Sequence, residues 1–174
     1  MVMSNHKLEL VWEDERWKKN FADLAEWATD IFDKAVAFVI KEDFGFSTWK
    51  NKKIIINLAF SNDAHVQKLN AEFRGKDAPT NVLSFANIDD DAFCKLADVS
   101  DEVELGDIIV AWETLEKEAK EKGIELKNHF AHLLVHGILH LFGFDHMYDE
   151  EAEEMEAIEI ILLKQFDINN PYEE

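Results

Sequence analysis

Residues 136–146 read HGILHLFGFDH and place three histidines at fixed spacing around a glycine. His136 and His140 lie four residues apart in an apolar run, so a helix presents both imidazoles on one face, one turn apart. Gly143 can take a positive φ and end that helix, which lets the chain bring His146 back toward the other two. The spacing therefore predicts that His136, His140 and His146 bind one metal ion, with zinc favoured.

The same spacing, H-x-x-x-H-x-x-G-x-x-H, occurs in the metzincin peptidases. There a glutamate follows the first histidine and acts as general base, whereas this chain has Gly137 at that position. Three protein ligands also leave the fourth position of a tetrahedral site open, as catalytic zinc sites do. The alternative is three core histidines bonded to the backbone, and each would then need a polar partner in an apolar setting.

The other histidines and Asp145 each have more than one possible role. His132, four residues before His136, is either a group that supports a metal ligand or a satisfied core histidine. His129, His65 and His6 fit core or surface positions better than a ligand set. Asp145 could orient an imidazole or cap the following helix.

The histidines lie in the most apolar helix that the sequence predicts, over 125–142. A helix that is apolar nearly all round is a central, buried one. The other patterns predict strands at 6–12, 53–59, 82–88 and 106–112, helices at 14–42, 62–73 (capped by Ser61), 113–122 and 149–167, and an acidic loop at 89–104. This order predicts an α+β fold, a small mixed β-sheet packed with helices, in a single domain over residues 1–174.

The composition limits the partners and the compartment. The chain has 37 acidic and 18 basic residues and a net charge of −19, so its surface repels nucleic acid and anionic membranes at long range. A polyanion partner would need a local cationic site. Cys94 is the only cysteine, which excludes an intrachain disulfide and fits a reducing compartment. With no apolar signal core at the N-terminus and no stretch of membrane-spanning length, we expect a cytoplasmic protein without a membrane partner.

A second motif, RGKDAPTNVLSF at 74–85, places Arg74 and Lys76 in a turn before a strand. On composition alone it fits a solvated turn. Together with HGILHLFGFDH and ELGDIIV (104–110), however, it closely resembles the YbeY family of bacterial metal-dependent endoribonucleases, also called rRNA maturation factors. The three motifs stand in the family's order, and the resemblance runs from about residue 53 to about 165.

The resemblance implies a zinc-dependent enzyme that cuts single-stranded RNA, matures the 3′ end of small-subunit ribosomal RNA and takes part in ribosome quality control. It implies metal ligands at His136, His140 and His146, and a key arginine at Arg74. It also implies a zincin-like fold in which a small sheet lies beside the central helix that bears the histidines. The chain departs from the family pattern at three positions, with Phe144 for Tyr, Asn81 for Asp and Ala86 for Pro, and the last two leave the shape of the substrate groove open.

We expect Arg74 to bind a phosphate bidentately and to stabilise the negative charge of the transition state. His136 is the other residue expected to be catalytic, and Lys76 with lysines 50, 52 and 53 is expected to form a cationic rim. Either a water or the RNA 2′-hydroxyl could be the nucleophile, and no side chain stands out as general base. Two other functions stay open: a non-catalytic, metal-stabilised ribosome-assembly factor, which the acidic surface favours through basic partners such as ribosomal proteins, and a metallopeptidase.

Overall fold

The computed structural model describes residues 6–173. Residues 1–5, part of the N-terminal stretch in which the sequence predicts no apolar signal core, lie outside the described residues. The elements, in chain order, are β1 (Lys7–Trp12), α1 (Arg16–Asn20), α2 (Leu24–Lys41), η1 (Ser47–Trp49), β2 (Lys53–Ser61), α3 (Asp63–Arg74), β3 (Val82–Ala86), α4 (Asp91–Val99), β4 (Glu102–Ala111), α5 (Trp112–Lys122), α6 (Leu126–Leu141) and α7 (Asp149–Lys164).

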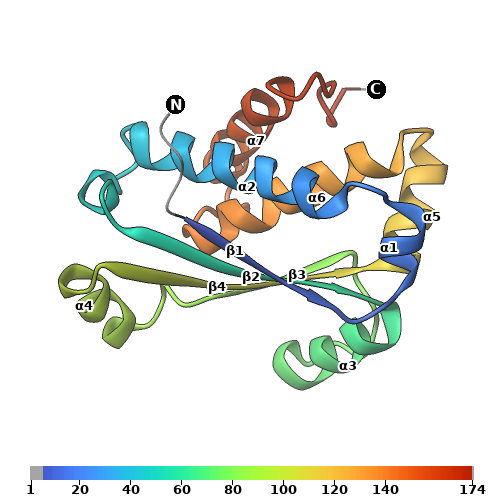
Figure 1. Cartoon of the computed structure of the whole chain (residues 1–174), viewed down its shortest axis with the longest axis horizontal. Helices are drawn as coiled ribbons and strands as arrows, with labels where there is room; N and C mark the ends of the chain where they lie inside the picture. Colours follow the sequence, from blue (N-terminus) through green and yellow to red (C-terminus); the bar gives the residue numbers. More distant parts are fainter. Residues whose placement is uncertain (1–5, 174) are drawn as a thin grey trace.

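The four strands form one mixed sheet, as the sequence predicts. Their order is β1-β2-β4-β3; the first three run parallel, and β3 pairs antiparallel with β4 at the edge. Helices α2, α6 and α7 lie on one side of the sheet, and α3 lies on the other (Figure 1). The α+β fold is confirmed.

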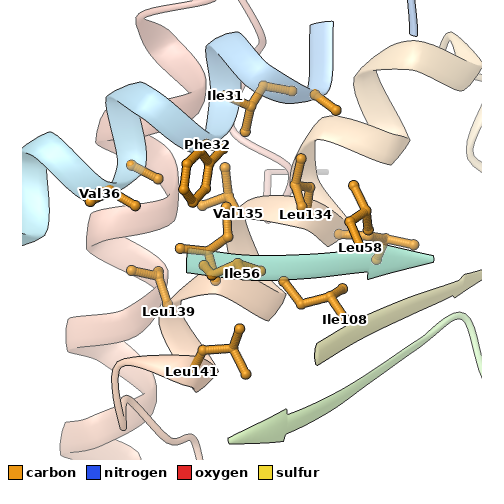
Figure 2. Close-up of a cluster of buried hydrophobic side chains, with 14 of the residues drawn as sticks. Ile31, Phe32, Val36, Ile56, Leu58, Ile108, Leu134, Val135, Leu139 and Leu141 are labelled. Atoms are coloured by element: carbon orange, nitrogen blue, oxygen red, sulfur yellow. The ribbon is translucent and has the colours of Figure 1, made fainter. Parts of the chain in front are cut away.

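The main core lies between the sheet and α6. Side chains from α2, β2 and β4, among them Phe32, Ile56 and Ile108, pack against the buried face of α6, which contributes Val135 (Figure 2); all four are fully buried. Apolar residues on nearly every side of α6 are thus explained by contacts with the sheet and with α2, α5 and α7. The core therefore fixes the helix that carries His136 and His140.

The helix predicted over 14–42 is wrong as one element, because the chain breaks after Asn20 and α2 starts at Leu24. Trp17 is fully buried and donates its indole N–H to the backbone oxygen of Ser61 at 2.8 Å, which anchors α1 at the end of β2. Helix α2 instead packs along α6. The two helices pack against different parts of the protein, although the spacing of their apolar residues is continuous in the sequence.

The acidic loop predicted over 89–104 is also wrong. Asp90 accepts from the backbone N–H of Ala92 at 2.9 Å and caps α4, and β4 begins at Glu102. Val103 and Leu105 are buried, and this alternation is the strand signal that the surrounding acidic residues obscured.

The cap of α3 differs from the prediction by one residue. Asn62, not Ser61, accepts from the backbone N–H of His65, at 2.9 Å. Ser61 still pairs with Ala111 in the sheet, so its backbone is strand and the first free capping position is the next one. No helix within residues 6–173 is both long and apolar enough to cross a membrane.

Candidate metal centre

The end of α6 brings the three predicted histidines together. His136 and His140 lie on one face of the helix, and their Nε2 atoms are 3.0 Å apart. Gly143 has φ of 96°, so the predicted left-handed turn is present, and it leads the chain back to His146. One ring nitrogen from each histidine lies within 4.8 Å of the other two. The set is a group that could hold a metal ion.

The hydrogen-bond partners of the rings fix which nitrogens can bind a metal. His140 Nδ1 lies 2.9 Å from the backbone oxygen of Phe144, which only accepts, so Nδ1 carries the proton and Nε2 keeps its lone pair. Burial, followed by the neighbouring His136 and His146, lowers the pKa of His140 to about 4. His140 is therefore neutral at pH 7, the state that a metal ligand requires.

His136, like His140, is oriented by a hydrogen bond at Nδ1. Its Nδ1 lies 3.1 Å from Glu159 Oε1, and burial would raise the pKa of that carboxyl, but hydrogen bonds from His132 and His136 lower it to about 2. The carboxylate accepts a hydrogen bond from Nδ1–H, which leaves Nε2 as the nitrogen of His136 that can face a metal ion.

This geometry fits a metal ion. The two Nε2 atoms face each other across 3.0 Å, an arrangement that either a shared proton or a metal ion between them stabilises. Two nitrogens bound at 2.0–2.1 Å to a tetrahedral zinc ion are about 3.3 Å apart. The observed spacing is close to that value, and His146, an exposed residue, supplies the third nitrogen from the loop.

The histidines form one wall of a cleft of about 1040 Å³. The opposite wall is β3 with the end of α3 and the turn between them, and it includes Arg74, Lys76 and Ser84. Arg74 Nη2 donates to the backbone oxygen of Ser84 at 2.6 Å, and its guanidinium lies over the ring of Phe85 at 5.4 Å. The structure therefore brings the predicted arginine to the cleft that contains the three histidines.

Gly137 shows why the peptidase glutamate has no place in this chain. A Cβ atom at this position would lie 3.2 Å from two side-chain carbons of Ile108 and 3.2 Å from Ser84 Oγ. Glycine lets α6 approach β4 and β3 closely, and a larger side chain would have to displace both contacts. The position of the general base in metzincins is thus a packing position here.

Comparison with known proteins shows the family of this chain. The family model described as endoribonuclease YbeY matches residues 12–167. The chain belongs to the YbeY family. It is 50% identical over 119 residues to the endoribonuclease YbeY of Paramagnetospirillum magneticum, covering 68% of this chain and 71% of that protein. It is 42% identical over 151 residues to the protein of the same name from Sphingopyxis alaskensis, covering 86% of this chain and 90% of that protein. The solution structure of TM1509 from Thermotoga maritima shares the fold, with a TM-score of 0.53 and 19% identity over 97% of this chain and 100% of that one.

Two of the departures from the YbeY pattern have visible partners. Asn81 donates from Nδ2 to Glu118 Oε1 at 3.0 Å, and the same carboxylate lies 2.9 Å from His129 Nε2. The ring of Phe144, where the family usually has Tyr, packs edge-on against Phe44 at 5.2 Å. Asn81 thus ties the turn at the cleft to α5, and through Glu118 to α6.

Replacing Asn81 by Asp, the residue common in the family, is expected to destabilise this chain at neutral pH. The amide donor is lost and a second carboxylate faces Glu118, which we expect to cost about 1 kcal/mol of unfolding free energy. Urea unfolding at pH 7 measures the loss. Because protonation of either carboxyl removes the repulsion, the difference in unfolding free energy between the variant and the unmodified chain should narrow as pH falls below 5. An equal difference at pH 7 and below pH 5 would argue against the mechanism.

Not every sequence prediction about the site is confirmed. Of the four lysines expected at the cationic rim, only Lys76 lines the cleft. Lys52 Nζ donates to the backbone oxygens of Ala97 and Ser100 at the end of α4, and Lys53 lies 3.9 Å from Glu102. Asp145 accepts from the backbone N–H of His146 at 2.7 Å, and α7 starts after Tyr148, so Asp145 neither holds an imidazole nor caps α7.

Sequence reasoning missed Glu159 and Tyr172. Glu159 is fully buried on α7, on the same face as Met155, Ile158 and Leu162. An acidic residue inside an apolar stripe was the available signal, because a buried carboxylate needs dedicated partners. His132, left open by the sequence, is one of those partners, at 2.9 Å from Glu159 Oε1.

Proposed function

We propose that this chain is a zinc-dependent endoribonuclease that cuts single-stranded RNA in the cleft between α6 and β3. The observation that carries the proposal is the meeting of three imidazoles with Arg74 in one cleft. The names of the related proteins support the reaction class. The assigned roles are metal ligands for His136, His140 and His146, with His136 and Arg74 in the catalytic machinery.

Arg74 is suited to binding a phosphodiester. A guanidinium carries five N–H donors in a fixed fork, so Arg74 can hold the backbone oxygen of Ser84 and still donate two hydrogen bonds to a phosphate. Its contact with Phe85 limits the directions it can take. Together with Lys76, it offers positive charge to the RNA in a chain of net charge −19.

The donor set favours zinc among the divalent ions. Three neutral imidazoles suit a tetrahedral zinc site with one open position. A zinc ion held there supplies Lewis-acid chemistry at a phosphate oxygen. The protein residues orient the phosphate through Arg74 and direct the Nε2 atoms of His136 and His140 inward, through the contacts of their Nδ1 atoms with Glu159 and the backbone oxygen of Phe144. A water or the RNA 2′-hydroxyl then serves as nucleophile.

The biological substrate that we propose is the 3′ end of small-subunit ribosomal RNA in the cytoplasm, with the small ribosomal subunit or its proteins as partner. The acidic surface fits this limited role, because it opposes non-specific RNA binding away from the cleft. It also suits contact with basic proteins. A non-catalytic assembly factor would share this surface, so the decisive test is cleavage.

Replacing Arg74 by Ala, and separately His136 by Ala, is expected to lower cleavage of a labelled single-stranded RNA by at least about 100-fold, in line with the loss of one transition-state contact. Lys68→Ala is the matched control, because it removes one positive charge from the exposed face of the same helix, α3, away from the cleft. Zinc content of each protein is measured in parallel by elemental analysis. Full cleavage in both cleft variants would overturn the proposal, and a zinc-loaded wild-type chain that leaves RNA uncut would favour the assembly factor.

A further inference from the structure

A buried carboxylate links the metal-binding helix to the C-terminal turn of the chain. Glu159, on α7, is fully buried and has three polar partners: His136, His132 and the hydroxyl of Tyr172. Tyr172 follows α7 by eight residues in the sequence and returns to lie against its inner face. The histidine motif gives no hint of this link, since Glu159 and Tyr172 both lie outside it.

The Tyr172 hydroxyl lies nearer to one carboxylate oxygen of Glu159 than to the other, which is Oε1 at 3.1 Å. Oε2 accepts from the Tyr172 hydroxyl at 2.7 Å, which is the shortest contact of the group. Oε1 faces His132 Nε2 at 2.9 Å and His136 Nδ1 at 3.1 Å. With Oε2 held by Tyr172, the carboxylate cannot rotate freely, and Oε1 stays directed at the His136 ring.

The position of Tyr172 is itself fixed by several contacts. Its backbone N–H donates to Asn170 Oδ1 at 2.8 Å, and its ring packs edge-on against His132 at 5.4 Å. Nearby, Phe166 packs edge-on against Trp27 of α2 at 5.3 Å, and this contact holds the segment that follows α7 against α2. The C-terminal turn is therefore docked, although Tyr172 remains 43% exposed.

We propose that Glu159 and Tyr172 are positioning residues for the metal site: they set the tautomer and direction of His136, so the C-terminal turn contributes to metal affinity. The inference rests on the metal site of the proposed function. A carboxylate on the second nitrogen of a histidine ligand orients the ring and raises its basicity. Here Tyr172 holds that carboxylate in turn, although the hydroxyl touches no metal ligand in the histidine motif.

A purely structural role for the cluster makes a different prediction. If Glu159 only satisfied His132 and Tyr172, its replacement would change the melting temperature and leave metal affinity and ligand geometry alone. If it positions His136, affinity and the spectrum of the bound ion change even in a protein that stays folded. Metal affinity and the visible absorption of bound cobalt(II), which reports ligand geometry, therefore separate the two roles.

The test uses Glu159→Gln, Tyr172→Phe and the control Glu153→Gln, which removes the same charge from the exposed face of α7. Zinc affinity is measured by competition with a chelator, and cobalt(II) spectra are recorded without RNA. Glu159→Gln is expected to bind zinc about 10–100-fold more weakly, and Tyr172→Phe to weaken binding less but in the same direction, with a shifted cobalt spectrum in both. Glu153→Gln should match the wild type.

Unchanged zinc affinity and spectra in both Glu159→Gln and Tyr172→Phe would overturn the inference. Should Glu159→Gln fail to fold, Tyr172→Phe decides alone, because it removes only a hydroxyl from a half-exposed side chain. The readouts do not involve RNA. A wild-type chain that binds zinc and cuts no RNA would therefore overturn the nuclease proposal while leaving this inference supported by the affinity loss.

Discussion

Replacing His140 by Ala is expected to remove most of the stabilisation of this protein by zinc while leaving the metal-free protein folded. His140 contributes one of the two Nε2 atoms that lie 3.0 Å apart. Without it, only His136 and His146 remain of the three ligands. In the metal-free protein the loss is small, because the ring is only partly buried.

The expected size follows from ligand linkage. With free zinc at 100 times the dissociation constant, binding adds about 2.7 kcal/mol to the unfolding free energy of the wild type. If the loss of a ligand weakens affinity by 100-fold, the same zinc concentration adds only about 0.4 kcal/mol to His140→Ala. Thermal or urea unfolding with and without zinc measures the difference.

His65→Ala is the control for this experiment. His65 is also a partly buried histidine, but it lies on α3, where its Nδ1 is 2.9 Å from Ser61 Oγ and 3.1 Å from Glu13. Its zinc-induced stabilisation should equal that of the wild type. A full zinc response in His140→Ala would mean that the three histidines do not form the binding site.

The meeting of the three histidines could be predicted from the sequence because its geometry is local. Helical periodicity places His136 and His140 on one face, and Gly143 supplies the positive φ that returns the chain to His146. Strands rich in β-branched residues and the apolar α6 gave the mixed sheet and the central helix in the same way. In each case the pattern that predicts the element lies within a few residues along the chain.

What the sequence did not reveal depends on contacts between distant segments. Glu159 is 23 residues from His136 in the chain, and Tyr172 is 40 residues from His132. Likewise, the break after Asn20 depends on Trp17 reaching Ser61, 44 residues away. Periodicity describes which face of an element is apolar, but it contains no information on which other element covers that face. For the same reason, Arg74 could be assigned to the site only through the family resemblance and not from the spacing of residues.

Replacing Gly106 by Ala is expected to destabilise the sheet more than any other glycine-to-alanine change in the described chain. Gly106 has φ of 141°, a conformation that side chains rarely adopt, and a Cβ atom would lie 2.0 Å from the backbone oxygen of Phe85. It would also lie 3.1 Å from a methyl group of Leu141, at the end of α6. Neither the strand backbone of β3 nor the buried helix end can move away cheaply.

The site of this clash explains why the effect should extend to the metal centre. Gly106 pairs with Ala86 of β3, and the register of β2 against β4 shifts just before it, because Ile55 pairs with Glu104 and Ile56 with Gly106. β3 forms the wall of the cleft opposite the histidines. A displaced β3 would therefore widen or distort the cleft as well as weaken the sheet.

We expect Gly106→Ala to lower the unfolding free energy by about 3–5 kcal/mol, from roughly 1–3 kcal/mol of backbone strain and a similar cost of overpacking. Gly123→Ala is the matched control, because Gly123 also has a positive φ, 65°, but has no heavy atom near the position of an added Cβ. It should lose only about 1 kcal/mol, the strain alone. Urea unfolding of both variants measures the difference, and equal losses would show that the contact with Phe85 does not constrain β4. If the difference is found, the glycine of the ELGDIIV motif is required by the close approach of β3, and the cleft wall and the sheet are parts of one packing arrangement.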